Sequence, residues 1–432
     1  MKTTVNLIKP VLFRWLAFIL TYSLIIVVLY YSLYHLGVLK KLPMTQNLLN
    51  WDASWYYSIS SEGYYFKPNE QSNAGFFPGF AYLWKVLGLS PLGISIVNLL
   101  LFLSGAFMLK EVIKSSYLKL FLIVSLPSVF FFYLPYSESL FYFFSSIFII
   151  SWYKNWKYLT FVFALALSFV RPVFFFLIPA LLGIFLLKKQ EGFQYVKSSL
   201  VIMIGLLIGA SLGMLIIGEQ VGDLFAYSKS QIIFWEHGLK WPSFPLTTWR
   251  SYRILWLDGL ALLLTVCAVI ILIRDFLRVH FFNWKTQLSI IEIVALGYLM
   301  MILVYIIFFH PVENGRTSIL SINRYVFCNP FLHFVLLKRI GTIKLSLKHI
   351  AIPLMASILV VLAIGVPFAS IVQLNYEQSL IFSGALLAFF MASSLVFYKW
   401  RYQKYYSILF LATSLIVQLY LFNSFLKGNW VG

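Results

Sequence analysis

The sequence predicts an all-α integral membrane protein, built as a bundle of many helices that cross the bilayer. Of its 432 residues, 61% are hydrophobic and 11% are charged, whereas a soluble domain carries about 25% charged residues. So few charges cannot cover a surface that faces water, so lipid must be the main solvent of this chain. Apolar runs of roughly 20 residues, the length of a spanning helix, recur along the sequence. The formal net charge of +19 is attributed to membrane topology, and no nucleic-acid partner is expected.

The apolar runs and the charged residues between them predict thirteen spans. The first run, at about 11–36, lacks a small-residue cleavage pattern, so it is expected to remain as a helix rather than act as a signal peptide. The apolar stretch 158–187 is too long for one crossing. Proline disfavours helical geometry at the residue before it, so this stretch is divided at Arg171 into two short spans. The other ten spans are expected at about 91–109, 119–134, 139–152, 200–217, 254–273, 288–309, 326–337, 350–372, 379–398 and 406–425.

Lysine and arginine concentrate on one side of these spans, which the positive-inside rule assigns to the cytoplasm. The N-terminus is therefore expected in the cytoplasm, and three polar loops are expected outside, at 37–90, 218–253 and 310–325. Most carboxylates of this acid-poor chain also fall on the outer side. No repeat at a fixed period and no low-complexity linker is visible, so residues 1–432 are interpreted as one membrane domain.

The first outer loop contains an aspartate between two tryptophans. Trp51, Trp55 and Ile59 recur at helical spacing, which predicts a short helix lying in the membrane interface. Asp52 and Tyr56 then share a stripe of this helix that faces inward. Asp52 is either the N-cap of the helix or a general base at the outer rim of the membrane, and one residue can fill both roles.

Two further signals complete this loop. Gly63 is expected to end the first interfacial helix, since glycine readily adopts the left-handed conformation found there. Pro78 suits the first turn of a second interfacial helix, which would guide a lipid chain towards the site. Ordinary anchoring of the neighbouring aromatic side chains in lipid is the alternative.

Two charged residues lie at the outer ends of apolar helices. Glu138 falls between the third and fourth spans, and Arg171 is the single charge within a long apolar stretch. An ionisable residue at a membrane boundary indicates a functional site, and a guanidinium has the planar fork that suits phosphate. The alternatives are a solvated loop acid at Glu138 and an arginine that snorkels to the headgroups at Arg171.

The loop that follows span 288–309 collects His310, Glu313, Arg324 and Tyr325. A histidine, an acid and an arginine at one helix mouth are the groups that an anionic sugar-phosphate site uses. No spacing resembles a zinc or calcium site, so no structural metal is predicted. A divalent cation held mainly by substrate phosphate stays open. The two cysteines lie in apolar runs, which predicts neither a disulfide nor a thiolate metal site.

Taken together, these features resemble the family of GPI mannosyltransferase II, the PIG-V type, within the GT-C class of membrane glycosyltransferases. The resemblance covers most of the chain to about residue 340. Where the family pattern often reads Arg-x-Asn-Gly, this chain has Arg171-Pro172-Val173-Phe174, and the match is closer to bacterial relatives. Five features occur in the same order and on the same outer side: Trp51-Asp52, Phe76-Phe77-Pro78, Tyr136-Ser137-Glu138-Ser139, Arg171 and Arg324-Tyr325.

The resemblance implies a GT-C-like core at about 1–340 and additional membrane helices at about 350–425. It also implies transfer of a sugar, mannose in the family, from a polyprenyl- or dolichyl-phosphate donor to a hydroxyl of a glycan, lipid or protein acceptor. Transfer would occur on the extracytoplasmic face with inversion, and Asp52 would be the general base. The substrate site would be lined by Trp51, Tyr56, Glu138, Arg171, His310, Glu313, Arg324 and Tyr325. The expected location is the bacterial plasma membrane, or the endoplasmic reticulum membrane in a eukaryote.

Two other classes of protein stay open. An O-antigen ligase or polymerase would use a diphosphate-lipid donor on the same outer face, and such enzymes usually place their key arginines in a late loop. A lipid or polysaccharide transporter (a flippase) would bind near the bilayer midplane through broken helices and internal repeats. The ionisable residues cluster at one face and no halves repeat, so the transferase is the preferred hypothesis.

Overall fold

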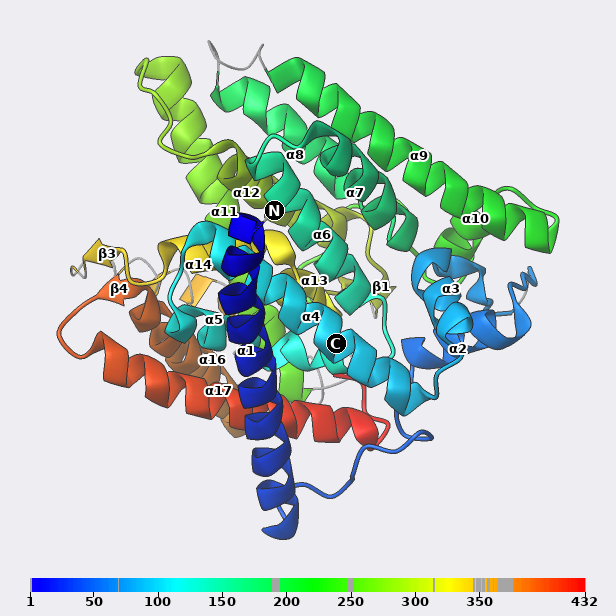
Figure 1. Ribbon diagram of the computed structural model, residues 1–432, viewed down its shortest axis with the longest axis horizontal. Coiled ribbons are helices and arrows are strands. Elements are labelled where there is room, and N and C mark those ends of the chain that lie inside the picture. Colours follow the sequence, from blue (N-terminus) through cyan, green and yellow to red (C-terminus); the bar gives the residue numbers. More distant parts are fainter. Residues whose placement is uncertain are drawn as a thin grey trace.

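The computed structural model describes residues 2–431 apart from several short gaps, and its regular structure is almost entirely helical (Figure 1). The gaps are 69, 189–194, 248–251, 314, 345, 347–350, 352–353, 356–357, 360 and 364–375. In the described part, the strands are two-residue pieces that form one antiparallel and one parallel pair. The prediction of a helical protein is thus confirmed.

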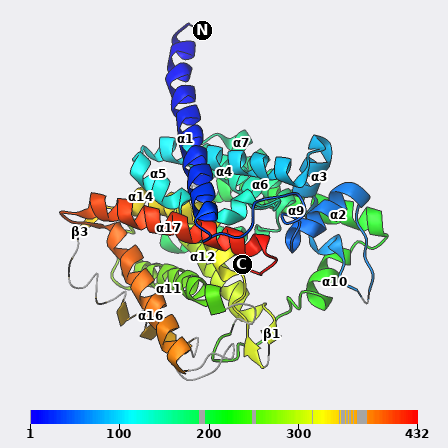
Figure 2. The same cartoon turned by 90° about the horizontal axis from the view of Figure 1, so that it is seen from below.

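The N-terminal third holds two long helices and several short ones. The N-terminal end of α1 extends beyond the other helices, as Figure 2 shows. The elements are α1 (Lys2–His35), α2 (Asp52–Glu62), η1 (Asn73–Gly75), α3 (Pro78–Leu87), α4 (Pro91–Ile113), α5 (Tyr117–Val124), η2 (Pro127–Tyr133) and α6 (Glu138–Tyr153).

The middle of the chain forms paired helices and a small hairpin. The helices are α7 (Lys157–Val170), α8 (Phe174–Leu187), α9 (Val196–Val221), α10 (Ala226–Ile233), α11 (Tyr252–Phe281) and α12 (Ile290–Phe308), and the hairpin is β1 (Val312–Glu313) with β2 (Arg316–Thr317). The close packing of α9 on α7 requires a residue without a side chain at Gly209, because a Cβ there would overlap the carbonyl oxygen of Leu165.

Short helices precede the last long ones in the C-terminal part. The elements are α13 (Ile322–Phe327), α14 (Pro330–Arg339), β3 (Ile343–Lys344), α16 (Tyr376–Phe397), β4 (Tyr398–Lys399) and α17 (Gln403–Leu426). Helix α17 packs against η2 and α5. Buried hydrogen bonds join it to distant parts of the chain, since the Gln418 Oε1 accepts from the Tyr133 hydroxyl at 3.1 Å and Tyr22 lies 2.6 Å from Tyr133.

In the described part of the chain, six helices are long and apolar enough to cross a membrane. They indicate an integral membrane protein, as predicted, while the number of thirteen crossings and the side on which each loop lies stay predictions. The six segments are Pro10–His35, Pro91–Ile113, Val196–Val221, Trp256–Phe281, Ile290–Phe308 and Gln403–Leu426. Shorter apolar helices cover Lys157–Val170, Phe174–Leu187 and Leu386–Phe397.

Prolines explain where the helices differ from the prediction. The span expected at 119–134 is not one continuous helix, because α5 ends at Val124 and a 3₁₀ helix begins at Pro127. The span expected at 326–337 is likewise divided, since α13 ends before Pro330 and α14 begins there. The break expected at Arg171 is confirmed between α7 and α8. Much of the span predicted at 350–372 lies outside the described residues.

The two short helices expected in the first loop are both present. Helix α2 packs against α3 (Figure 1). The 3₁₀ helix η1, which lies between them in the sequence, contacts α10. Gly63, at φ +92°, ends α2, and Pro78 is the first residue of α3, as predicted. This pair of helices places Asp52, at the start of α2, beside the bundle.

Candidate functional site

The site begins with an unusual backbone conformation at Trp51. Its φ of 57° and ψ of −129° lie in a region that residues with a side chain rarely adopt, and such strain is found mainly at functional positions. The indole ring of Trp51 packs edge-on against Trp430, with ring centroids 5.1 Å apart. Packing from a segment far along the chain therefore supports the turn that leads into Asp52.

Asp52 is the first residue of α2, and its carboxylate binds an arginine. The Oδ2 of Asp52 accepts from the Nη1 of Arg324 at 2.6 Å. The N-cap position belongs to Trp51, which provides no side-chain cap. The interpretation of Asp52 as the N-cap is therefore wrong, because its side chain reaches across to α13 instead.

Glu138 is the centre of the charged cluster. Its Oε1 accepts from the Nε of Arg324 at 2.5 Å and from the Nη1 of Arg171 at 2.6 Å. The side chain is only 1% exposed, which excludes the alternative of a solvated loop acid. Its other oxygen, Oε2, has no hydrogen-bond partner within the described residues. Four charged groups that the sequence distributes over 272 residues, Asp52, Glu138, Arg171 and Arg324, thus form one cluster.

Burial and charge act on Glu138 in opposite directions. Burial by itself would raise the pKa of this carboxyl group, but the guanidinium groups of Arg324 and Arg171 outweigh it and lower the pKa to about 2. Glu138 is therefore ionised at neutral pH, and it holds the two arginines close together despite their like charges.

The two arginines differ in how many of their donors are used. Arg324 bonds both acids and is 7% exposed, and its guanidinium carbon lies 4.6 Å from the ring centroid of Tyr136. Arg171, in the break between α7 and α8, is 21% exposed and bonds only Glu138 among the described residues. Its remaining N–H donors are available to a ligand, which argues against simple snorkelling.

Aromatic residues surround the cluster. The Tyr56 hydroxyl donates to the Oγ of Ser137 at 2.8 Å, and the ring of Tyr325 lies 5.9 Å from the guanidinium carbon of Arg171. Both tyrosines were predicted for the site. Sequence reasoning missed Tyr136 as a wall of the site, although it directly precedes Ser137 and Glu138 and follows an aromatic run.

His310 and Glu313 lie on the loop and hairpin that follow α12. His310 is buried and stacks on His237 with ring centroids 5.4 Å apart, and Tyr305 lies between this pair and Tyr325. Burial, and then the neighbouring His237, lower the pKa of His310 to about 3. Glu313 pairs with Arg316 in the β1–β2 register. His310 thus belongs to a second layer of residues around the charged cluster, to which it is connected through Tyr305 and Tyr325.

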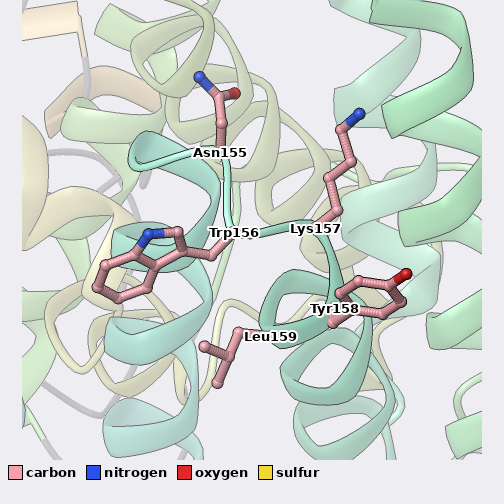
Figure 3. Close-up of a pocket in the computed structure, with 5 residues that line it drawn as sticks. All are labelled: Asn155, Trp156, Lys157, Tyr158 and Leu159. Carbon is pink, nitrogen blue, oxygen red and sulfur yellow. The ribbon is translucent and has the colours of Figure 1, made fainter.

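A surface hollow of about 490 Å³ lies elsewhere (Figure 3). Asn155, Trp156, Lys157, Tyr158 and Leu159 line it, in the turn between α6 and α7. Glu138 begins α6 and this turn follows the end of that helix, so the two are roughly 24 Å apart along a 16-residue helix. The hollow is therefore distinct from the charged cluster.

No group of three or more His, Cys, Asp or Glu side chains that could hold a metal ion occurs in the described part of the chain. Asp52 and Glu138 both bind Arg324 in this arrangement. The hypothesis of a divalent cation held mainly by substrate phosphate stays a prediction. Both cysteines, Cys267 and Cys328, are free.

No protein-family model, no curated protein and no solved structure matches this chain. The functional interpretation therefore depends on the geometry of the charged cluster.

Proposed function

We propose that the protein is a membrane glycosyltransferase that moves a sugar, mannose in the preferred hypothesis, from a polyprenyl-phosphate donor to an acceptor hydroxyl. The observation that carries this proposal is the cluster itself. It combines a partly exposed carboxylate, Asp52, with an arginine, Arg171, whose donors are only partly used. Such a pair has the groups needed to take a proton on one side and to bind a phosphate on the other.

Asp52 is assigned as the general base. An acceptor hydroxyl is a poor nucleophile until a positioned base takes its proton. The hydroxyl oxygen forms the new bond to the anomeric carbon as the bond to the phosphate oxygen breaks. Its proton passes to Asp52, and the bonding electrons leave with the lipid phosphate. Attack from the face opposite the phosphate inverts the anomeric centre.

The arginines are assigned to the leaving phosphate. The donor is a phosphodiester with one negative charge, and the released lipid phosphate carries more. A cation already in place stabilises such a developing charge without reorganisation of the site. Arg171 has the open donors for this role, and its guanidinium fork matches phosphate oxygens. Arg324, which bonds both acids, would hold the base and the phosphate site in a fixed relation.

The decisive experiment compares Asp52→Asn with wild type in lipid nanodiscs. Radiolabelled mannosyl polyprenyl phosphate is the donor, and total lipid and glycan extract supplies the acceptor. Loss of the base is expected to lower the transfer rate by about 10²- to 10⁴-fold. The matched control is Asp223→Asn, which also removes an aspartate from an ion pair, the one with Lys229, and is expected to transfer at the wild-type rate.

Transfer by Asp52→Asn within severalfold of wild type would remove the base assignment. Transfer from diphosphate-linked donors alone would favour the ligase or polymerase class. Translocation of a labelled lipid by both wild type and Asp52→Asn, with no transfer by either, would favour the transporter class.

A further inference from the structure

Asp258 is a buried acid on α11 that the proposed chemistry does not use. Its side chain is completely buried. The Oδ1 of Asp258 accepts two hydrogen bonds from Asn323, one from the side-chain Nδ2 at 2.7 Å and one from the backbone N at 3.3 Å. Oδ2 has no partner within the described residues. Burying an acid is costly unless it is hydrogen-bonded. Packing alone therefore does not explain why an aspartate occupies this position.

The backbone bond from Asn323 supplies a missing helix cap. Helix α13 has only six residues, and Ser321 in front of it has a φ of 68° and provides no side-chain cap. The first N–H groups of any helix lack partners inside that helix, and a side-chain oxygen normally accepts from one of them. For α13, the accepting oxygen comes from Asp258, on another helix.

The side chain of Asn323 is held from the opposite side as well. The Oγ of Ser128, in η2, donates to the Oδ1 of Asn323 at 3.0 Å. The amide group of Asn323 therefore bridges α11 and η2, and its orientation is fixed by a donor on one side and an acceptor on the other. Arg324 is the next residue, and it joins Asp52 to Glu138.

We infer that Asp258 is a positioning residue for Arg324. A helix of six residues is too short to hold its own geometry, since isolated helices under about 12–15 residues are marginal. Asp258 fixes the first turn of α13 against α11. Arg324 then leaves that turn at the angle that lets its Nη1 reach Asp52 while its Nε reaches Glu138. In the proposed transferase, Asp258 thus sets the donor site without touching the substrate, an assignment that rests on the proposed function.

Hydrogen–deuterium exchange tests the structural half of this inference without any assay of activity. Asp258→Leu removes the acceptor at similar volume, and Asp258→Asn keeps one carbonyl oxygen for Asn323. The matched control is Thr265→Val, which removes another buried polar group of α11, one that among the described residues donates only to the carbonyl of Leu262 in its own helix. In Asp258→Leu, the amide of Asn323 is expected to exchange about tenfold faster, the effect of one lost hydrogen bond. Asp258→Asn and Thr265→Val are expected to retain wild-type protection.

Binding of polyprenyl phosphate by the same variants tests the functional half. Asp258→Leu is expected to raise the dissociation constant at least tenfold, and Asp258→Asn to restore it. The kinetic counterpart is a higher KM for the lipid-phosphate donor with a smaller change in kcat. If Asp258→Leu does not fold, Ser128→Ala takes its place, because it releases Asn323 from the other side and is expected to weaken binding severalfold.

Wild-type protection of Asn323 in Asp258→Leu, or donor binding no weaker than in Thr265→Val, would overturn the inference. Failure of wild type to bind or transfer the polyprenyl donor contradicts the proposed function instead, and the exchange experiment still decides whether Asp258 holds α13.

Discussion

Two buried glutamates of this protein each hold two cations, and they do so differently. Glu292, near the start of α12, uses both oxygens. Its Oε1 accepts from the Nε of Arg339 at 2.7 Å, and its Oε2 accepts from the Nζ of Lys338 at 2.7 Å and from the backbone and hydroxyl of Ser289. Glu138 is equally buried, yet both arginines meet at one oxygen and the other oxygen has no partner within the described residues.

The difference separates a structural ion cluster from a candidate site. The cations around Glu292 are each 40% exposed, so water shares their charge, and every oxygen of the acid is satisfied. Around Glu138 the arginines are 21% and 7% exposed, and the acid is left with an unused acceptor. Buried polar atoms without a partner are rare in native proteins and call for a specific explanation. In the proposed function, the Glu138 cluster is the part of the molecule that meets the substrate.

The largest expected effect comes from removing the acid of each cluster. Glu138→Gln leaves the Arg171 guanidinium without its carboxylate partner and Arg324 with Asp52 alone, which costs about 3–5 kcal/mol. Glu292→Gln is expected to cost about 1–2 kcal/mol, because Lys338 and Arg339 can turn to water. Urea unfolding in a mild detergent measures both. Equal losses of unfolding free energy in the two variants would show that both clusters stabilise the fold in the same way. That result would contradict the distinction between a structural ion cluster and a candidate site.

The second effect is a pH dependence of stability that arises from the stacked histidines His237 and His310. Burial lowers the pKa of His237 to about 4 and that of His310 to about 3. The unfolded chain takes up these protons near pH 6.5, while the folded protein does so only at lower pH, so stability is complete above about pH 6.5 and falls as the pH drops. At about pH 5, His310 alone is expected to cost about 2 kcal/mol.

Melting temperatures between about pH 7.5 and about pH 5 check this expectation. His310→Gln should flatten the decline, whereas His35→Gln, which changes an exposed histidine, should leave it unaltered. If the melting temperature fell equally in wild type, His310→Gln and His35→Gln, groups other than His310 would be responsible for the decline. The loss from protonating Glu138 is expected only below about pH 4.5, because its folded pKa is about 2.

The smallest effect tests which cation meets the ligand. Arg171→Gln removes a charged donor, and the affinity for polyprenyl phosphate is expected to fall at least tenfold, since a bond to a charged group contributes about 1.5–3 kcal/mol. Lys338→Gln, the matched change in the other cluster, is expected to leave this affinity unaltered. Equilibrium binding in nanodiscs gives both values. Weaker binding in Lys338→Gln than in Arg171→Gln would reverse the assignment of the two clusters.

The sequence was sufficient for those features that depend on local chemistry. Apolar runs predicted the long helices, Gly63 and Pro78 predicted the ends of the short ones, and proline predicted the break at Arg171. Charge in an apolar setting also pointed to Asp52, Glu138, Arg171 and Arg324, because an ion is placed there only with a partner or a function. That these four meet was an expectation, and the structure brings them together.

The partners themselves could not be predicted, because they depend on the tertiary fold. Asp258 was visible as an acid within a predicted span, but nothing local to it indicates Asn323, 65 residues away. Likewise, Pro127 is a local signal for a helix break, but nothing local indicates that η2 packs against α17. Helical periodicity indicates which face of a helix is apolar, but it does not indicate which other helix covers that face.

The packing of Trp51 against Trp430 has a consequence for biogenesis. The turn before Asp52 emerges early during synthesis, whereas Arg324 and Trp430, which hold it in place, enter the membrane only much later. Until then these contacts do not stabilise the strained turn at Trp51. Contacts between residues so distant in sequence also form slowly. A nascent chain would therefore lack the charged cluster, which is assembled as one of the last events of insertion.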